Sequence, residues 1–322
     1  MKFFIKKNYF ISFFIFYSAF IFNAEAKRMT IFTCEPEWGA LAREIVGEKA
    51  DVVVATRAFT NPSLRIEKDF KLLSSMMKAD VVFCAGGGLE DAWLPALLKN
   101  SSSKEIKSGK AVLMAYDYIK PLHKNAAGEK NNERIHLNPN NLLTIAPKFL
   151  EIMLFVDVEN ATFYRQYYQN FDKKLRAQII SWQERAQSLK GMKVALRNDA
   201  WAYLVDWLSL DVVLKIEDEK GVDKNLYEMQ KLLEKNPAKV IIFADFEKKQ
   251  IIYDLSKKTK IRVVLLPFTV GGTIGAKDIF YLYENTINRL LTDCSKTTCQ
   301  NIGVRPVMDY LSPNQTIVDQ AN

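Results

Sequence analysis

The feature that most limits the fold of this chain is a long stretch without helix breakers. Between Val158 and Leu189 there is neither proline nor glycine. Apolar side chains recur there every three or four residues, which predicts one amphipathic helix. At 1.5 Å per residue this helix is on the order of 45 Å long, and Gly191 ends it. We therefore expect a spine that joins two lobes, with the repeating residues Phe163, Tyr167, Phe171, Leu175, Ile179, Trp182, Ala186 and Leu189.

Short β-branched runs alternate with amphipathic helical segments on both sides of this spine. Such alternation is typical of parallel sheets that are covered by helices. The predicted fold class is α/β, with two doubly wound parallel-sheet lobes joined by the long spine helix. The expected strands cover residues 29–34, 50–56, 80–87 and 110–116 before the spine, and 192–198, 211–217, 238–245 and 261–268 after it.

The first residues have the pattern of a secretory signal peptide. Lys2, Lys6 and Lys7 precede an apolar run, and Ala24-Glu25-Ala26 places small residues where a signal peptidase reads them. We expect cleavage after Ala26 and a periplasmic location. An uncleaved anchor helix is the alternative, but the apolar run is shorter than the roughly 20 residues that span a bilayer.

These observations predict the domain organisation. A signal peptide covers residues 1–26, an N-terminal α/β lobe residues 27–157, the linking helix residues 158–190, a C-terminal α/β lobe residues 191–291, and a polar tail residues 292–322. Two lobes, a spine and a signal peptide together indicate an exported bilobed binding protein. Ligands of open α/β sheets bind at the carboxyl ends of the strands, so the candidate site lies among the loops that follow them.

Charge excludes one class of partner. The net charge is +8, and the loss of three lysines and one glutamate with the signal peptide lowers it to +6. This excess fits attraction to an anionic membrane surface, or a simply solvated basic surface. Basic residues do not cluster beside aromatic ones, so we expect no nucleic-acid partner. No nucleophile, base and acid fall in compatible loops, and we expect no enzyme.

The chain has four cysteines. In an exported protein an even number suggests disulfides. Cys294 and Cys299 are close enough in sequence to pair, and we predict that they do. Cys34 and Cys84 each end a strand-like run, so they either bridge neighbouring strands or remain two buried thiols.

Three segments resemble a known family. They are "CEPEWGALAREIVGEKADV", "ADVVFCAGGGLEDAWLPALL" and "VVLLPFTVGGTIGAKDIFYLYENTINRLL". They are similar to the zinc- and manganese-type periplasmic substrate-binding proteins of ABC transporters, over nearly all of residues 29–291. The resemblance implies an ABC permease as partner, and a metal held between the lobes by three histidines and a carboxylate.

The residues at the family's four ligand positions differ from that set. Ser63 stands in the place of the first histidine, Arg134 of the second and Asn198 of the third, and Ile274 replaces the carboxylate. The whole chain has only two histidines, so a three-histidine site cannot form. We expect no tightly bound zinc or manganese, and no other cofactor.

Arg134 is the most informative of these replacements. A guanidinium is permanently charged and has no lone pair for a metal. Three interpretations stay open: Arg134 replaces the metal electrostatically, it makes the cleft a site for an anionic or polar ligand, or the site has decayed and Arg134 faces solvent.

Other candidates are weaker. Glu35 and Glu37 follow the first strand near the mouth of the cleft, and are either replacement oxygen ligands, ion-pair partners of Arg134 or solvated surface groups. His136 lies two residues past the ligand register, and His123 lies in a polar loop. The glycine run Ala85 to Gly88 lacks the lysine of a phosphate-binding loop, which favours a structural turn.

The sequence thus predicts a periplasmic solute-binding protein of the metal-transport family whose usual metal site is replaced. The alternative is an envelope scaffold or interaction protein that reuses the fold. The identity of a solute and the oligomeric state are not encoded in any pattern above.

Overall fold

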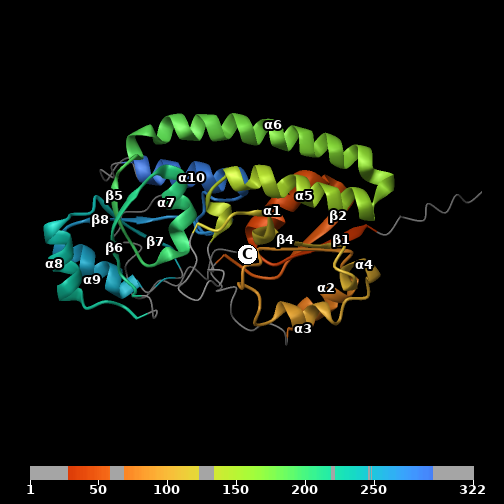
Figure 1. Ribbon diagram of the computed structural model, residues 1–322, viewed down its shortest axis with the longest axis horizontal. Coiled ribbons are helices and arrows are strands. Elements are labelled where there is room, and N and C mark those ends of the chain that lie inside the picture. The colour runs from red at the N-terminus through yellow and green to blue at the C-terminus, as the bar shows by residue number, and fades with distance from the viewer. Residues whose placement is uncertain are drawn as a thin grey trace, which may run out of the picture.

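The computed structural model describes residues 28–58, 69–122, 134–218, 222–245, 247 and 249–292. Two four-stranded parallel sheets lie side by side, each flanked by helices (Figure 1). All eight strands fall on the runs expected from the sequence, and the α/β fold of two parallel-sheet lobes is confirmed. Within the described residues no helix is long and apolar enough to cross a membrane.

The first sheet has the strand order β2-β1-β3-β4. Strand β3 is buried throughout and β1 over its last three residues, because helices cover both faces of the sheet. The elements are β1 Met29–Thr33, α1 Pro36–Val46, β2 Ala50–Val54, α2 Phe70–Lys78, β3 Val81–Cys84, α3 Leu94–Leu98, α4 Lys104–Lys107, β4 Val112–Met114 and α5 Asn140–Val156.

The second sheet repeats this order as β6-β5-β7-β8. Its register shifts between Val194 and Ala195, where β5 pairs with β6. The elements are β5 Lys193–Leu196, α7 Ala202–Leu208, β6 Asp211–Lys215, α8 Leu226–Lys235, β7 Val240–Phe243, α9 Lys249–Thr259, β8 Arg262–Leu265 and α10 Ile279–Leu291.

One expected helix is much shorter than the sequence suggested. The sequence of residues 90–100, "EDAWLPALLKN", predicts a helix after the third strand, but α3 covers only Leu94–Leu98. Glu90 instead turns its carboxylate back to the amides of Ala85 and Gly86, which fixes the preceding residues as turns. The local hydrogen bonds of a glutamate therefore outweigh helical spacing here.

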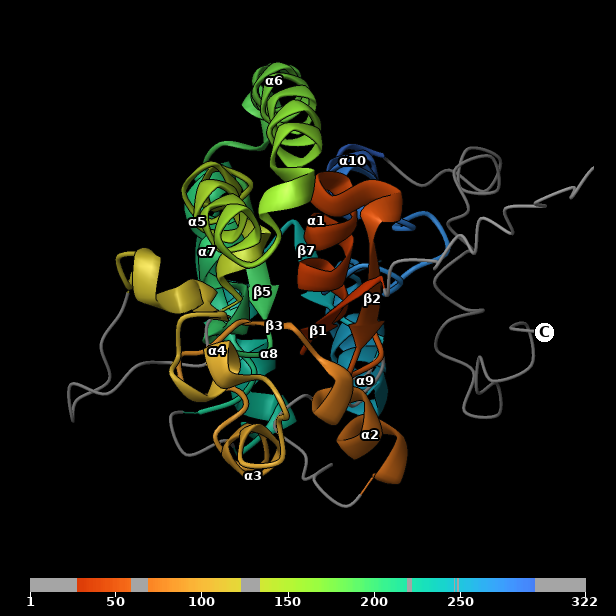
Figure 2. The same ribbon diagram turned by 90° about the vertical axis from the view of Figure 1, so that its right-hand side faces the viewer.

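The spine is present as expected. Helix α6, Ala161–Arg185, runs along both lobes and lies above α5 and α10 (Figures 1 and 2). It buries Tyr164, Phe171, Leu175, Ile179 and Trp182 on one face. Short 3-10 turns complete the chain: Gly47–Lys49, Ala115–Tyr118, Ile135–Leu137, Val158–Asn160, Ala186–Leu189 and Asp199–Trp201.

The apolar core does not stop at the boundary between the lobes. One continuous cluster of buried side chains includes strand residues of the first sheet, the inner face of α6, and residues of β5, β7 and α10. Only a smaller second cluster, under α8 and α9, is separate from it among the described residues. The two sheets are therefore held by one core.

Candidate functional site

The loops at the carboxyl ends of both sheets supply the polar residues of the candidate site. Glu35 and Glu37 follow β1, and Glu90 follows β3. Phe268 and Thr269 follow β8 of the other sheet. All five side chains are buried, with Glu35, Glu37 and Glu90 at most 2% exposed. Three buried carboxyl groups are unusual unless each is paired or hydrogen-bonded.

Glu37 is paired with His136 across 2.9 Å, from its Oε1 to Nδ1 of the ring. The hydroxyl of Thr269 donates a hydrogen bond to Oε2 of the same carboxylate. Burial alone would raise the pKa of Glu37, but His136, Thr269 and the charge of Arg134 outweigh it and lower this pKa. Glu37 is therefore an ionised carboxylate that both lobes hold.

His136 is a structural bridge between the lobes. Its Nε2 lies 2.9 Å from the carbonyl oxygen of Phe268, which can only accept, so Nε2 donates this bond. Its own carbonyl oxygen accepts a 2.6 Å hydrogen bond from the hydroxyl of Tyr283. Both ring nitrogens are occupied by protein groups, and neither is offered to a metal.

Arg134 lies against the same cluster. The carbon centre of its guanidinium is 5.1 Å from the centroid of the Phe268 ring, within the range of a cation–π contact. The residue is only partly buried, but its Nε is out of contact with solvent and has no hydrogen-bond partner in the described chain. Burial lowers the pKa of Arg134, whereas the carboxyl groups of Glu37, Glu35 and Glu90 raise it.

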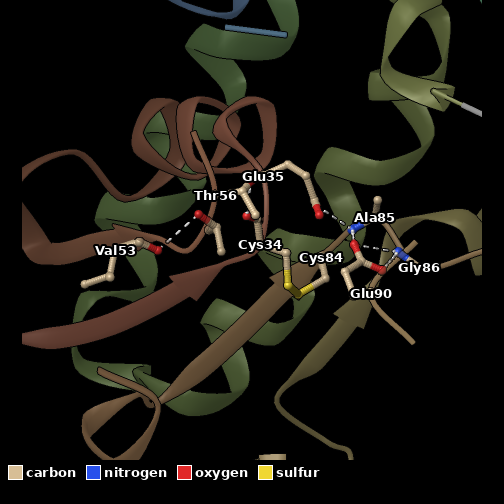
Figure 3. The surroundings of a disulfide bond; sticks show 9 residues. Cys34, Glu35, Val53, Thr56, Cys84, Ala85, Gly86 and Glu90 are labelled. Atoms are coloured by element: carbon tan, nitrogen blue, oxygen red, sulfur yellow. Dashed lines mark hydrogen bonds between the residues drawn. A yellow bond between two sulfur atoms is a disulfide. The ribbon is translucent and has the colours of Figure 1, made fainter. Parts of the chain in front are cut away.

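Glu35 and Glu90 form a pair on the floor of this region (Figure 3). The amide of Ala85 donates to both, at 3.2 Å to Glu35 Oε2 and 2.9 Å to Glu90 Oε1. The amide of Gly86 donates to Glu90 Oε2 at 3.0 Å. Burial, followed by the neighbouring charges of Glu90 and Glu37, raises the pKa of Glu35 well above its usual range. Burial also raises the pKa of Glu90, but its hydrogen bond with Glu35 lowers it, whereas the same hydrogen bond raises the pKa of Glu35. Glu35 is therefore the member of the pair that holds a proton more readily.

This arrangement explains the glycine run. Gly86, Gly87 and Gly88 all have positive φ, which lets the chain turn back so that its amides meet Glu90. The anion at this strand end is thus the chain's own carboxylate. The run is a structural turn, as the sequence favoured.

Cys34 and Cys84 form a disulfide between the ends of β1 and β3, with their Cα atoms 4.8 Å apart (Figure 3). This resolves the alternative that the sequence left open. Within the described segments, one group of metal-capable side chains converges, and it consists of Cys34, Cys84 and Glu90. Cys294 and Cys299 lie outside the described residues, and their pairing stays a prediction.

The C-terminal lobe presents a different set of contacts. Asn198 caps the turn that follows β5: its Oδ1 accepts from the amide of Ala200 at 3.0 Å, and its Nδ2 donates to Glu217 at 2.6 Å. The neighbouring Arg197 pairs with Asp223 at 2.9 Å. Asn198 is therefore engaged within its own lobe.

Glu247, at the end of β7, has a perturbed acidity. Its Oε1 accepts a 3.4 Å hydrogen bond from the indole of Trp201, and its Oε2 accepts a 3.2 Å bond from the amide of Ala244. Burial raises the pKa of Glu247 to about 7 despite these hydrogen bonds. Trp201 in turn packs edge-on against Phe268, the ring beneath Arg134.

The structure thus brings together only part of the predicted site. Arg134, Glu35, Glu37 and His136 form one cluster, whereas Ile274 is 81% exposed. Ser63 and His123 lie outside the described residues. Sequence reasoning missed the roles of Glu90, Glu247, Phe268 and Thr269. The available signal was a glutamate shortly after a buried strand in both "FCAGGGLE" and "FADFE".

Comparison with known proteins supplies the family. The model of the family described as "Zinc-uptake complex component A periplasmic" (ZnuA) matches residues 31–292. The chain belongs to the ZnuA family. No sequence among curated proteins matches it.

Solved structures of low sequence identity share the fold of this ZnuA-family chain. A crystal structure of ZnuA superposes with a TM-score of 0.69 at 17% identity, covering 81% of this chain and 99% of that one. A periplasmic metal-binding protein from Candidatus Liberibacter asiaticus gives 0.68 at 13% identity, covering 82% and 98%. The binding protein FpvC from P. aeruginosa, solved with Ni²⁺, gives 0.66 at 20% identity, covering 82% and 96%.

Proposed function

We propose that this ZnuA-family chain is a periplasmic solute-binding component of an ABC transporter whose interlobe site does not hold a divalent metal. In this proposal Arg134 replaces the metal electrostatically. The observation that carries it is the placement of the guanidinium against Phe268, among the buried carboxyl groups of Glu37, Glu35 and Glu90. This placement supports the first of the three interpretations of Arg134 over a side chain turned to solvent.

The magnitude of the repulsion supports this interpretation. A divalent ion about 5 Å from a guanidinium would be opposed by roughly 7 kcal/mol at an effective dielectric constant of about 20. That amounts to about five powers of ten in affinity. Carboxylates nearby offset part of it, but Glu37 is already bound by His136 and Thr269.

The remaining side chains are poor ligands. Ile274 has no lone pair, and the amide of Asn198 is engaged by Ala200 and Glu217. His136 has both ring nitrogens occupied. A tetrahedral zinc site needs several nitrogen, sulfur or oxygen donors free to converge, and these residues do not provide them.

The charge count also bears on an anionic ligand. One proton on the Glu35–Glu90 pair leaves about two negative charges from three carboxyl groups. The positive charges against them are that of Arg134 and that of the His136 ring, whose two nitrogens both face acceptors. The cluster has no positive excess to attract an anion. A neutral polar solute, or no solute, fits this balance better.

Calorimetric titration of the chelator-treated, oxidised protein with Zn²⁺ and Mn²⁺ at neutral pH tests the proposal. We expect no stoichiometric submicromolar site. Arg134→His alone should not create one, because the other three positions still lack donors; Arg165→His, on the exposed face of α6, is the matched control. Restoring histidine at Ser63, Arg134 and Asn198 with aspartate at Ile274 is the positive arm.

A submicromolar zinc site in the wild type that is lost in Arg134→Ala or Asn198→Ala would contradict the proposal and restore the ordinary metal function. A site lost only when His123 is changed would place zinc in the polar loop, outside the interlobe region.

The partner and the location complete the proposal. Family membership supports an ABC permease as partner and the periplasm as location, and the signal-peptide pattern supports export with cleavage after Ala26. Co-purification with the permease encoded beside it tests the partner. A protein that never associates with a permease would favour the envelope scaffold instead.

A further inference from the structure

The disulfide and the carboxyl pair lie next to each other at the ends of β1 and β3 (Figure 3). We propose that, once the Cys34–Cys84 disulfide is reduced, the two cysteines together with Glu90 and Glu35 form a site for a thiophilic divalent cation such as Zn²⁺. None of its ligands occupies one of the four family ligand positions. The guanidinium of Arg134 is near enough to act on Glu35 and Glu90, so it opposes a cation here as well, but two thiolates, which the four family positions lack, offset this repulsion. This site does not depend on the function proposed above.

The geometry of the ligand atoms favours such a site. The two sulfurs and a carboxylate oxygen of Glu90 all lie within 4.8 Å of one another. In a tetrahedral zinc site, bonds of about 2.3 Å to sulfur and about 2.0–2.2 Å to oxygen place ligand atoms roughly 3.5–4 Å apart. After reduction the two sulfurs must move apart, and the Glu90 carboxylate must move about 1 Å closer to them. Rotation of the three side chains can supply these movements, which give three of the four ligands of a tetrahedral site.

The fourth corner is suggested by an independent observation. Oε1 of Glu35 is buried and has no hydrogen-bond partner in the described chain. The other oxygen of this carboxyl group shares the Ala85 amide with Glu90, so the two carboxyl groups meet at this amide. Glu35 is outside the group of atoms within 4.8 Å, and its side chain would have to turn toward the sulfurs to become the fourth ligand. A buried oxygen without a partner costs free energy, and a metal bond would satisfy it.

The surroundings would hold such ligands in position. The amides of Ala85 and Gly86 fix the Glu90 carboxylate, and β1 and β3 pair in parallel and hold the two cysteines side by side. Hydrogen bonds of this kind orient metal ligands and raise metal affinity. All four side chains are at most 2% exposed, as in a closed structural site.

The chemistry makes the disulfide and the metal mutually exclusive. A dithiol reductant transfers two electrons and two protons to Cys34–Cys84, so that the S–S bond breaks, two thiols form and the reductant becomes a disulfide. Buried thiols in apolar surroundings are unreactive, but a bound cation is held by two thiolates and two carboxylates. It therefore displaces both thiol protons and the proton on the Glu35–Glu90 pair to solvent. The oxidised protein has no thiolate to offer. The redox state of one cysteine pair therefore selects between a covalent bridge and a metal site.

Cobalt titration tests this proposal, because Co²⁺ bound by thiolates in a tetrahedral site has charge-transfer and ligand-field absorption. The protein carries Cys294→Ser and Cys299→Ser, so that only one pair remains. It is reduced with dithiothreitol and desalted without oxygen, and its free thiols are counted. We expect the reduced protein to bind one Co²⁺ with thiolate absorption that Zn²⁺ abolishes, and the oxidised protein to bind none.

Two variants identify the ligands. Cys34→Ser should abolish the thiolate absorption of a tetrahedral site. Glu90→Gln keeps both cysteines and should weaken binding at least about tenfold, as the loss of supporting groups does in other metal sites. Glu151→Gln, on the exposed face of α5, is the control and should bind like the parent.

The proposal is overturned if the reduced protein has two free thiols and binds no Co²⁺, or if Glu90→Gln binds as tightly as the parent. Circular dichroism after reduction is part of the test, since a protein that unfolds when reduced cannot form the site. Zinc bound by the oxidised protein would contradict the function proposed above, whereas this inference concerns the reduced protein alone.

Discussion

Substitution of Glu247 by glutamine should make the protein more stable at pH 8, with a gain that grows as the pH rises from 5. Burial raises the pKa of this carboxyl group from its ordinary 4.5 to about 7. In the unfolded chain the group ionises near its ordinary value, whereas in the folded protein it keeps its proton up to about pH 7. Stability therefore falls as the pH rises through this window and is level above it.

The size of the effect follows from the same values. Each pH unit between the two pKa values is worth about 1.4 kcal/mol, so the ionised form costs about 3 kcal/mol of unfolding free energy at pH 8. Glutamine cannot ionise, and Glu247→Gln removes this cost. Glutamine has one carbonyl oxygen for the two donors, Trp201 and Ala244, so one hydrogen bond is lost. That loss of about 1 kcal/mol is similar at every pH.

Urea unfolding of both proteins at pH 5 and pH 8 separates the two effects. The stability of Glu247→Gln relative to wild type should rise by about 2 kcal/mol or more between these pH values. The exposed Glu234→Gln, in α8, is the control and should differ from wild type by less than about 0.5 kcal/mol at both. A relative stability of Glu247→Gln that does not change with pH would refute this reasoning.

Three further predictions concern the interlobe bridge, the disulfide and export. Glu37→Gln should lower the unfolding free energy by about 3–5 kcal/mol, because it leaves His136 buried without its partner. Adding His136→Gln should cost less than the sum of the two single losses, which a double-mutant cycle from urea unfolding measures. Cys34→Ser should lower the unfolding free energy by about 4 kcal/mol in non-reducing buffer, because the bridge closes a loop of 50 residues; equal stability of variant and wild type would speak against the bridge. Sequencing of the exported protein should begin at Lys27, and an intact Met1 would contradict cleavage.

The strands and the spine were predictable because each has a local period. Eight β-branched runs and the helical spacing after Val158 are visible within short windows of sequence. Arg134 was identified by its position in a motif, and the carboxyl groups of Glu37 and Glu35 are near enough to raise its pKa. The strands, the spine and the motif position of Arg134 each depend on residues that are close together in the sequence, so the sequence alone reveals them.

The paired contacts were not predictable for the opposite reason. Glu37 and His136 are about a hundred residues apart, and no period relates them. The bridge between Cys34 and Cys84 required that β3 lie beside β1, and that strand order is not readable from the runs themselves. Glu90 falls in the segment 90–100 that the sequence predicts to be helical. Its return to the amides of Ala85 and Gly86 depends on three successive glycines with positive φ, which the helical pattern does not reveal.

The single core beneath both sheets has a mechanical consequence. A binding protein that opens and closes by rotation of its two lobes needs a hinge at which they can rotate without breaking apolar contacts. Here the same buried cluster runs through β1, α6, β5 and α10, and a turn of one half would open it to water. Entry and exit of any solute must therefore be carried by rearrangement of the loops at the strand ends, with the two halves fixed. A permease would then recognise the loaded protein by the shape of its loop surface and not by the angle between its halves, and amide exchange should report both sheets opening in one global event.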